Sequence, residues 1–399
     1  GAKHMITPYT DKEKCTGCTA CKSVCPTQAI EMCPDQDGFL YPAVNAEVCT
    51  MCGLCQRICP IEIPVSDGRP LATYAAIHRD ECVLKNSSSG GAFSAIAQVV
   101  LSEKGVVFGC TLNQDLKAVH VGVESFSEIG KLQGSKYVQS EVGSTFLQVK
   151  KHLEEGRQVL YTGTPCQIAG LKAFLRKDYS NLLTVDLICH GVASPAFFSG
   201  YIQWLRKRLR AEILEFRFRD KAKMGYGCFG SVTYKKDGKV QSEVIIPILN
   251  YYYYYLKATL YRDCCYTCKY ACSDRQGDFT IGDYWGILEA HPEINASNGV
   301  SVLLVNSEKG MDLVNKLNDY LVLTKSSFER ASAKNVNLVR PSSKNAIRDK
   351  VLSVFREGGF EAVAVQYYRI NKFDIILYRV KSAIPFPLKQ VIKSILGKT

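Results

Sequence analysis

The chain has 399 residues, a length that predicts two or three domains rather than one. Hydrophobic residues make up 46% and charged residues 22%, a globular balance that excludes wholesale disorder and fibrous structure. The net charge of +12 is uneven, because residues 1–65 hold five Lys/Arg against seven Asp/Glu, whereas residues 366–399 hold seven basic residues and one acidic residue. No pattern of interleaved basic and aromatic residues accompanies this charge, so we expect no nucleic-acid partner.

Eighteen cysteines occur without the pattern of a signal peptide. This usage argues against a disulfide scaffold and indicates metal or redox chemistry in a reducing compartment. No apolar run is long enough to span a bilayer. We therefore expect a cytoplasmic protein, either soluble or peripheral to the inner face of the membrane.

Two cysteine motifs of the same spacing repeat about 34 residues apart near the N-terminus. Each reads Cys-x2-Cys-x2-Cys-x3-Cys-Pro, the pattern of bacterial ferredoxins, in which the fourth cysteine ligates the other cluster. Zinc is the alternative, but zinc sites use two pairs of ligands with a longer spacer. Residues 6–65 are thus expected to form a small domain with two [4Fe–4S] clusters. The predicted ligands are Cys15, Cys18, Cys21 and Cys59 for cluster I, and Cys49, Cys52, Cys55 and Cys25 for cluster II.

A linker over residues 61–69 leads to a predicted strand at 71–77 and then to a serine-rich loop before an apolar-periodic helix at 92–101. Such a loop offers free backbone N–H groups and hydroxyls to a phosphate. An ordinary serine N-cap would look the same, so both interpretations stay open. The loop residues are Ser87, Ser88, Ser89, Gly90 and Gly91. Strands at 106–109 and 119–123 and a helix at 145–154 are expected to follow.

A short apolar strand at 159–162 precedes a helix that runs to residue 174, with Thr164 as N-cap and Pro165 at its first position. This places Cys166 in the first turn, where amides and the helix dipole favour a thiolate. Another buried-type strand, at 182–188, ends in Cys189 and His190, and a helix at 196–209 follows. Strands that alternate with helices predict an α/β core.

Three further strands, at 213–218, 231–234 and 240–246, predict a strand-rich insertion with a hairpin turn at Asp237-Gly238. Five consecutive tyrosines follow at residues 251–255. They are interpreted as a partly buried helix face, with a stacking platform as the alternative.

Four cysteines lie within nine residues between Cys264 and Cys272. The nearest metal pattern, Cys265-x2-Cys268, supplies only two ligands, so partners must come from elsewhere. Cys166 and Cys189 both follow predicted strands, at the edge of a sheet where ligand sites gather. A third [4Fe–4S] cluster at Cys166, Cys189, Cys265 and Cys268 is one interpretation, and scattered thiols are the other.

Six motifs together resemble the coenzyme F420 hydrogenase/dehydrogenase beta-subunit family over about residues 71–306. They are the loop from Ser87 to Gly91, Gly134-Ser135-Lys136-Tyr137, Gly163-Thr164-Pro165-Cys166-Gln167, Cys189-His190-Gly191, Cys265-x2-Cys268 and Asp278-x4-Asp283-x-Trp285-Gly286. The resemblance implies an FAD between two α/β lobes, contacted by the serine loop, Lys136 and Tyr137, and it favours the third cluster.

The expected fold class is therefore α/β (mixed α+β), with a two-cluster ferredoxin domain ahead of a two-lobed α/β flavin-binding body. The expected divisions are 6–65 for the ferredoxin, 71–155 and 156–340 for the two lobes, and 341–399 for a basic helical tail.

Clusters carry single electrons, whereas a flavin accepts electrons singly and passes a hydride. We therefore expect an iron–sulfur flavoprotein oxidoreductase that passes electrons from a ferredoxin-like donor through the clusters to FAD and on to a small-molecule substrate. A surface-polysaccharide intermediate is one candidate substrate. His190 is a candidate proton donor, with packing beside Cys189 as the alternative. The other functions are an electron-transfer subunit without its own substrate, an F420-dependent reductase or dehydrogenase subunit, and a protein whose clusters are structural.

The basic tail from residue 366 contains a segment at 389–398 that can form an amphipathic helix. Contact with an anionic membrane surface or an acidic partner is one interpretation, and a helix docked on the body is the other.

Overall fold

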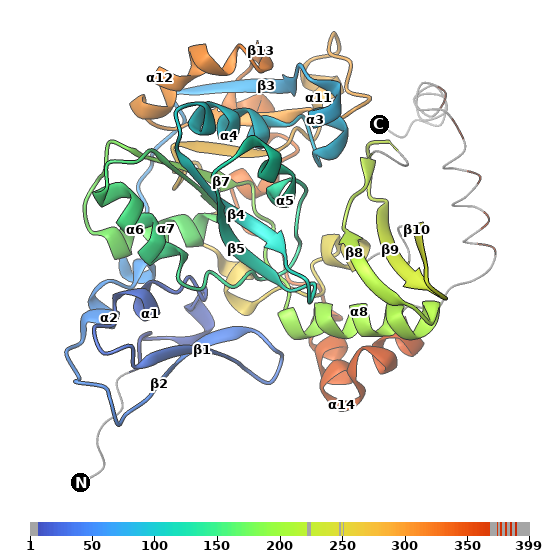
Figure 1. Ribbon diagram of the computed structural model, residues 1–399, viewed down its shortest axis with the longest axis horizontal. Coiled ribbons are helices and arrows are strands. Elements are labelled where there is room, and N and C mark those ends of the chain that lie inside the picture. Colours follow the sequence, from blue (N-terminus) through green and yellow to red (C-terminus); the bar gives the residue numbers. More distant parts are fainter. Residues whose placement is uncertain are drawn as a thin grey trace.

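The computed structural model describes residues 7–221, 225–246, 249 and 251–367, together with positions 373, 376, 380, 384 and 388. Three sheets organise these residues: a two-stranded sheet near the N-terminus, an eight-stranded sheet and a three-stranded sheet. Figure 1 shows the N-terminal module, in blue, beside α6 and α7 of the large sheet, with the three-stranded sheet at the other end of the molecule.

The N-terminal module is a small unit of two helices and one hairpin. Thr19 and Gly53, at φ 69° and φ 68°, begin the two helices in the left-handed conformation, which lets each cysteine loop turn sharply into its helix. The hairpin strands pair antiparallel, and Asp35 Oδ1 accepts the N–H groups of Asp37 and Phe39 at its turn. The elements are α1 (Ala20–Val24), β1 (Ile30–Pro34), β2 (Leu40–Val44) and α2 (Leu54–Arg57).

The eight-stranded sheet has the order β13-β3-β12-β11-β7-β6-β4-β5. Strands β4, β6, β7 and β11 run parallel, and the remaining pairs are antiparallel. The strands are β3 (Ala72–His78), β4 (Val106–Leu112), β5 (Ala118–Val123), β6 (Val159–Gly163), β7 (Leu182–Leu187), β11 (Phe279–Asp283), β12 (Ser301–Val305) and β13 (Leu321–Lys325).

Helices cover both faces of this sheet, as the apolar sequence of its central strands requires. Along β6, Leu160 packs in one core, with α4 and α12, while Val159 and Tyr161 pack in the other, with α6 and α7. This alternation follows from the two-residue period of a strand. The helices are α3 (Glu81–Asn86), α4 (Ala92–Ser102), α5 (Ile129–Leu132), α6 (Thr145–Glu154), α7 (Pro165–Leu175), α11 (Ile287–Ala290), α12 (Glu308–Leu317) and α13 (Phe328–Ser332).

The mixed α/β class and the N-terminal ferredoxin-like domain are confirmed. The predicted strands and helices between residues 71 and 209 all occur, with bounds that differ by a few residues. The large sheet takes strands from both 71–155 and 156–340, so the division into two lobes stays a prediction.

The predicted strand-rich insertion forms the three-stranded sheet β10-β9-β8, packed on α8 (Figure 1). Its hairpin turns at Asp237 and Gly238, which both have positive φ, as predicted. The long helix α14 (Arg348–Tyr367) packs on α8 from the other side, and Gly358 and Gly359 break its helical geometry. The bounds are α8 (Pro195–Leu209), β8 (Glu212–Arg217), β9 (Gly230–Lys236) and β10 (Lys239–Ile245).

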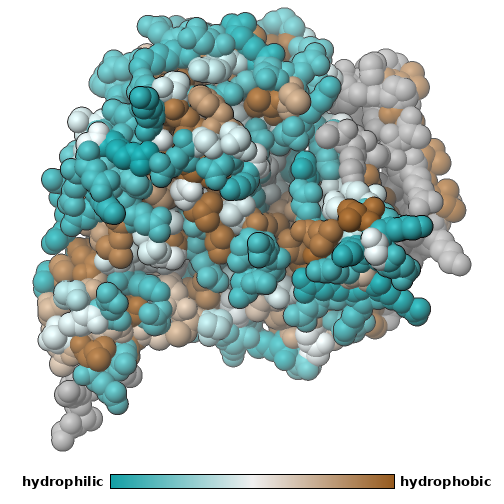
Figure 2. Space-filling model, in the orientation of Figure 1, coloured by the Kyte–Doolittle hydropathy of each residue, from teal (hydrophilic) through white to brown (hydrophobic). Residues whose placement is uncertain are grey.

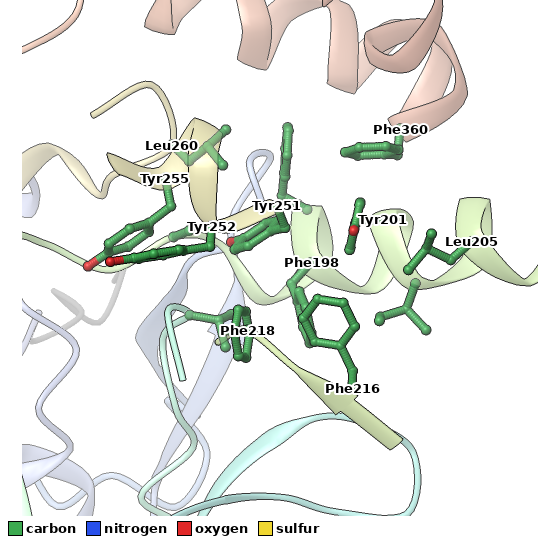
Figure 3. Close-up of a cluster of buried hydrophobic side chains, with 14 of the residues drawn as sticks. Phe198, Tyr201, Leu205, Phe216, Phe218, Tyr251, Tyr252, Tyr255, Leu260 and Phe360 are labelled. Atoms are coloured by element: carbon green, nitrogen blue, oxygen red, sulfur yellow. The ribbon is translucent and has the colours of Figure 1, made fainter. Parts of the chain in front are cut away.

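The tyrosine run forms most of α10 (Tyr251–Leu256), in which Tyr251 is buried and Tyr254 half-buried, as expected for a partly buried helix face. Figure 3 shows Tyr251 among Phe198, Tyr201 and Phe218. Tyr252 and Tyr255 are buried too, with less than 4% of each residue exposed.

Among the described residues, no helix combines the length and apolar character needed to cross a bilayer. Figure 2 shows that the face seen in Figure 1 is mostly hydrophilic, with hydrophobic side chains in separate patches. The predicted amphipathic helix at 389–398 lies outside the described residues, and so does nearly all of the basic tail.

Candidate functional site

The eight N-terminal cysteines gather around two small cavities in the predicted crossed arrangement. One cavity is lined by Cys15, Cys18, Cys21 and Cys59, and the other by Cys25, Cys49, Cys52 and Cys55. In each set, three thiols come from one loop and the fourth from the other motif, as in two-cluster ferredoxins. Burial raises the pKa of Cys18 to about 12, whereas Cys52 is exposed. The first set thus faces inward, and the second reaches the surface.

The first cysteine set lies directly against the α/β body. Helix α7 packs on α1, and a Cβ added at Gly170 would stand 3.0 Å from Cys18 Sγ. The start of the linker is also hydrogen-bonded to the body, since Lys269 Nζ donates to the carbonyls of Pro60 and Ile61 at 2.7 and 2.8 Å. The module therefore has a fixed docking position on the body.

A second group of cysteines lies at the carboxyl ends of two adjacent parallel strands. Cys166 begins α7 directly after β6, and Cys189 follows β7. Cys265 and Cys268 come from a short 3-10 helix (Asp263–Thr267) and the residue after it. The charge of the Cys189 thiol would interact with those of Cys166, Cys265 and Cys268, so the four predicted residues converge.

Burial determines the acidity of these thiols. It raises the pKa of Cys268 to about 12 and that of Cys166 above its usual value. At Cys166 desolvation thus opposes the thiolate expected in the first turn of α7, while a hydrogen bond with Thr164 favours it. Cys265 is the exception, since a hydrogen bond from the Cys264 thiol lowers its pKa.

The cysteine group opens into a cavity of about 260 Å³, which we call the central cavity. It also lies beside the serine loop, whose members Ser87, Ser88, Ser89 and Gly91 line it together with Lys136, Tyr137, Cys166, Cys189 and His190. Gly90 is not among the lining residues. A Cβ at Gly90 would meet Ala76 O at 2.1 Å and Ser301 N at 2.5 Å, so the loop backbone packs against these strands instead. Gly90 therefore provides a close approach between the loop and the strands.

The serine loop has a specific hydrogen-bond pattern. Ser87 Oγ donates to Val83 O and Ser89 Oγ donates to Val300 O, both at 2.8 Å. Ser88 Oγ instead accepts from Ser135 N at 2.8 Å, and among the described residues no acceptor takes its O–H proton. Ser88 is thus the hydroxyl available to a ligand, beside the amides that begin α4.

Lys136 lies at the cavity with its ammonium turned to the end of α5. Its Nζ donates to Gln133 O at 2.8 Å and Leu132 O at 3.1 Å, and also lies 3.4 Å from Lys131 O. Burial lowers the pKa of Lys136 to about 8, and the nearby charge of Arg217 acts in the same direction. Lys136 therefore offers the cavity a positive charge rather than a free N–H donor.

His190 is partly buried in the cavity wall. Desolvation lowers its pKa, and the negative charge of Asp283 opposes this shift. Its ring has no hydrogen-bond partner among the described residues, while its carbonyl accepts from Ser342 Oγ at 2.8 Å.

Two groups at the cavity were missed by reasoning from the sequence. Arg219 Nη1 pairs with Asp283 Oδ2 at 2.5 Å, and Tyr226 Oη donates to Asp283 Oδ1 at 2.9 Å. Lys221 Nζ donates to Ser89 O at 2.7 Å, which ties the insertion to the serine loop. The charged run Arg219-Asp220-Lys221 directly after the strand predicted at 213–218 was the feature of the sequence that could have indicated this group.

The second missed group is a hydrogen-bonded chain beside Cys166. Gln167 Nε2 donates to Ser140 Oγ at 3.0 Å, Ser140 lies 3.1 Å from His120 Nδ1, and His120 Nε2 lies 3.1 Å from Thr162 O. Gln167 Oε1 also accepts from Thr164 N at 3.0 Å, which completes the capping box of α7. The chain holds the first turn of α7, and with it Cys166, in place.

A ferredoxin-type module docked on an α/β body defines the class of the protein, which is an iron–sulfur electron-transfer protein with a [4Fe–4S] dicluster domain. Residues 14–63 match the family described as a 4Fe-4S dicluster domain. Residues 156–330 match the family described as the C-terminal part of the coenzyme F420 hydrogenase/dehydrogenase beta subunit. The chain thus combines a 4Fe-4S dicluster domain with a later region that matches the coenzyme F420 hydrogenase/dehydrogenase beta-subunit family.

A solved structure also resembles the chain. A chain of the xenon-derivatised F420-reducing [NiFe] hydrogenase complex from Methanosarcina barkeri is 16% identical, with a TM-score of 0.43. The match covers 74% of this chain and 89% of that chain. No curated protein matches this chain.

Proposed function

We propose that the protein is an iron–sulfur flavoprotein oxidoreductase, in which electrons pass from cluster II through cluster I and a third cluster to an FAD in the central cavity. One observation carries the proposal. Helix α7 touches Cys18 of cluster I through Gly170 and presents Cys166 in its first turn to the cavity. One rigid element thus links the ferredoxin module to the cavity.

The third cluster would be held by Cys166, Cys189, Cys265 and Cys268. Four thiols of this kind suit a [4Fe–4S] cluster by their chemistry. Among the described residues, no three His, Cys, Asp or Glu side chains converge closely enough to hold a single metal ion. A [4Fe–4S] cluster differs from a single ion, because each thiolate binds a different iron of the cube and the thiolates therefore lie farther apart.

The residues around the cavity fit a flavin nucleotide. The amides that begin the eleven-residue helix α4 and the Ser88 hydroxyl suit phosphate oxygens, and the Lys136 charge complements their negative charge. Tyr137 stacks on Tyr252 with ring centroids 4.1 Å apart, which gives the wall a flat aromatic surface. Bound there, a flavin would supply the conversion between single-electron transfer and hydride chemistry.

His190 is the proposed proton donor to a substrate in the cavity. Its ring borders the cavity and makes no hydrogen bond within the described residues, so the ring can reach a bound substrate, while desolvation lowers its pKa. If the ring instead only packs beside Cys189, His190→Gln will leave the turnover rate and its pH profile unchanged.

The external partner would exchange electrons at cluster II. Cys52 is exposed there, and Val48 and Met51 beside it expose 47% and 48% of their surface. A small apolar patch around an accessible cluster suits brief docking of a redox protein of ferredoxin type.

A second candidate is an electron-transfer subunit that feeds a partner and has no substrate of its own. The family description as a beta subunit favours it, and the F420 in the family name makes a deazaflavin one candidate acceptor. A surface-polysaccharide intermediate is the other proposed substrate class, and no residue of the cavity distinguishes between them.

The visible spectrum of anaerobically purified protein tests the proposal. We expect broad absorbance near 400 nm that bleaches with dithionite, and FAD released on denaturation, at about one per chain. Protein that binds iron but no flavin under reconstitution with FAD would contradict it. Reoxidation of the reduced chain by a small substrate alone would favour the enzyme over the electron-transfer subunit.

A further inference from the structure

Arg262 is a buried cation at the junction between the ferredoxin module and the body. No part of its surface is exposed. Its Nε donates to Cys15 O at 2.8 Å and its Nη1 to Leu40 O at 2.9 Å, so the guanidinium reaches into the module across more than 200 residues of sequence. Its guanidinium carbon lies 3.7 Å from the centre of the Tyr41 ring.

The positive charge of Arg262 lacks an ordinary counter-ion. Among the described residues no carboxylate pairs with it, and its Nη2 finds no hydrogen-bond partner. Burial disfavours the charged guanidinium, and the groups whose negative charge would favour it are, largest first, Cys264, Cys15, Tyr41 and Cys265. A buried cation is costly unless opposite charge lies close by. Among these groups Cys15 is a ligand of cluster I, and its carbonyl also accepts from Arg262 Nε, so cluster I supplies negative charge beside the guanidinium.

We propose that Arg262 raises the reduction potential of cluster I, so that an electron on cluster II moves inward to cluster I. The step is one electron: cluster II is oxidised, cluster I is reduced, and no proton or bond is exchanged. Reduction adds negative charge to cluster I, and a fixed cation in a poorly solvated interior stabilises that charge. The proposal rests on the two clusters of the dicluster domain and requires neither the flavin nor the third cluster.

Arg57 provides a natural comparison within the same module. Its Nη1 donates to Cys52 O at 2.9 Å, as Arg262 donates to Cys15 O. Arg57 is exposed, so water and salt screen its charge. The two arginines make the same kind of contact with one cluster loop each, and they differ in burial.

The test is a redox titration of the full chain followed by electron paramagnetic resonance, which gives a midpoint potential for each cluster. In Arg262→Met we expect one potential to fall, so that the ratio of reduced to oxidised cluster I at a fixed potential drops about tenfold, or about 59 mV for a one-electron couple. Arg262→Lys keeps the charge and should stay near the wild type. Arg57→Gln should lower the potential of cluster II by much less than Arg262→Met lowers that of cluster I.

Gln139→Glu is a second test, which changes the charge beside cluster I but leaves Arg262 in place. Gln139 Oε1 accepts from Leu40 N at 3.0 Å and lies 3.4 Å from Arg262 Nη1, and a glutamate can keep both contacts while neutralising the guanidinium. We expect it, too, to lower the potential of cluster I. If Arg262→Met loses iron, the potential of cluster I in Gln139→Glu alone tests the proposal. Unchanged potentials in Gln139→Glu, or a fall as large in Arg262→Lys as in Arg262→Met, would overturn the proposal.

Discussion

Gly170 of α7 lies against Cys18 of the ferredoxin module so closely that the helix has no room for a side chain there. A Cβ at position 170 would stand 2.9 Å from Cys18 Cβ and 3.0 Å from its Sγ. The same helix presents Cys166 to the central cavity, four residues earlier. The cluster I loop and the cavity are therefore held at a fixed separation by one turn of helix.

This contact predicts that Gly170→Ala weakens the docking of the module. Alanine favours a helix over glycine by about 1 kcal/mol, but overpacking against Cys18 costs about 1–3 kcal/mol. We expect a lower thermal midpoint and faster proteolysis in the linker at residues 61–69. Gly130→Ala is the control, because Gly130 lies in α5 with nothing within 4 Å of its Cβ position. Equal midpoints in the two variants would contradict the prediction.

The crossed cysteine sets predict which cluster each fourth ligand serves. Cys59 lies with Cys15, Cys18 and Cys21, so Cys59→Ala should disrupt the signal of cluster I. Cys25 lies with the second motif, so Cys25→Ala should disrupt cluster II. Electron paramagnetic resonance of the reduced variants measures this, with Cys33→Ala, an exposed cysteine, as the control. The reverse pattern of losses would show that the clusters are not crossed.

The buried pair of Asp186 and Arg275 should contribute strongly to the stability of the large sheet, where Asp186 of β7 also accepts from Thr280 of β11. Asp186 Oδ1 lies 3.1 Å from Arg275 Nη2, and both side chains are at most 1% exposed. Asp186→Asn leaves a buried cation without its partner, which we expect to cost about 3–5 kcal/mol. Glu329→Gln breaks the exposed pair with Arg69 and should cost under about 1 kcal/mol. Thermal midpoints compare the two, and similar losses would contradict the prediction.

His120 predicts a loss of stability in mild acid. Burial lowers its pKa to about 4, whereas an unfolded histidine titrates near 6.5. Below pH 6.5 His120 binds a proton in the unfolded chain but stays neutral in the folded chain. The free energy of unfolding therefore falls as the pH drops toward 4. Linkage gives about 2 kcal/mol between pH 7 and pH 5 for this group alone.

His120→Gln isolates that contribution, because glutamine can replace both ring hydrogen bonds but does not titrate. The thermal midpoint of the variant should fall less than that of the wild type between pH 7 and pH 5, measured without oxygen. Parallel decreases would show that other groups cause the acid sensitivity.

The sequence predicted the ferredoxin module in detail because its ligands follow from local spacing. It also placed Cys166 and Cys189 at the edge of a sheet where ligand sites gather, with a third cluster as one interpretation and scattered thiols as the other. The serine loop and Lys136 were expected at the same cavity from the family resemblance, and they line it. Their contacts with FAD stay a proposal.

Other features were out of reach because they depend on distant parts of the chain. The burial of Arg262 depends on contacts with Cys15 and Leu40, 247 and 222 residues away. The pairing of Arg219 with Asp283 depends on how the insertion folds back over the sheet. The hydroxyls of Ser87 and Ser89 are engaged within the protein, which no local pattern indicates.

The iron content of anaerobically prepared wild type and Cys189→Ser tests the account's central claim most directly. Three clusters predict about twelve irons per wild-type chain and about eight in the variant, whose ferredoxin signals should be retained. About eight irons in both proteins would contradict the account, because the cavity would then lack the cluster that connects it to the ferredoxin module.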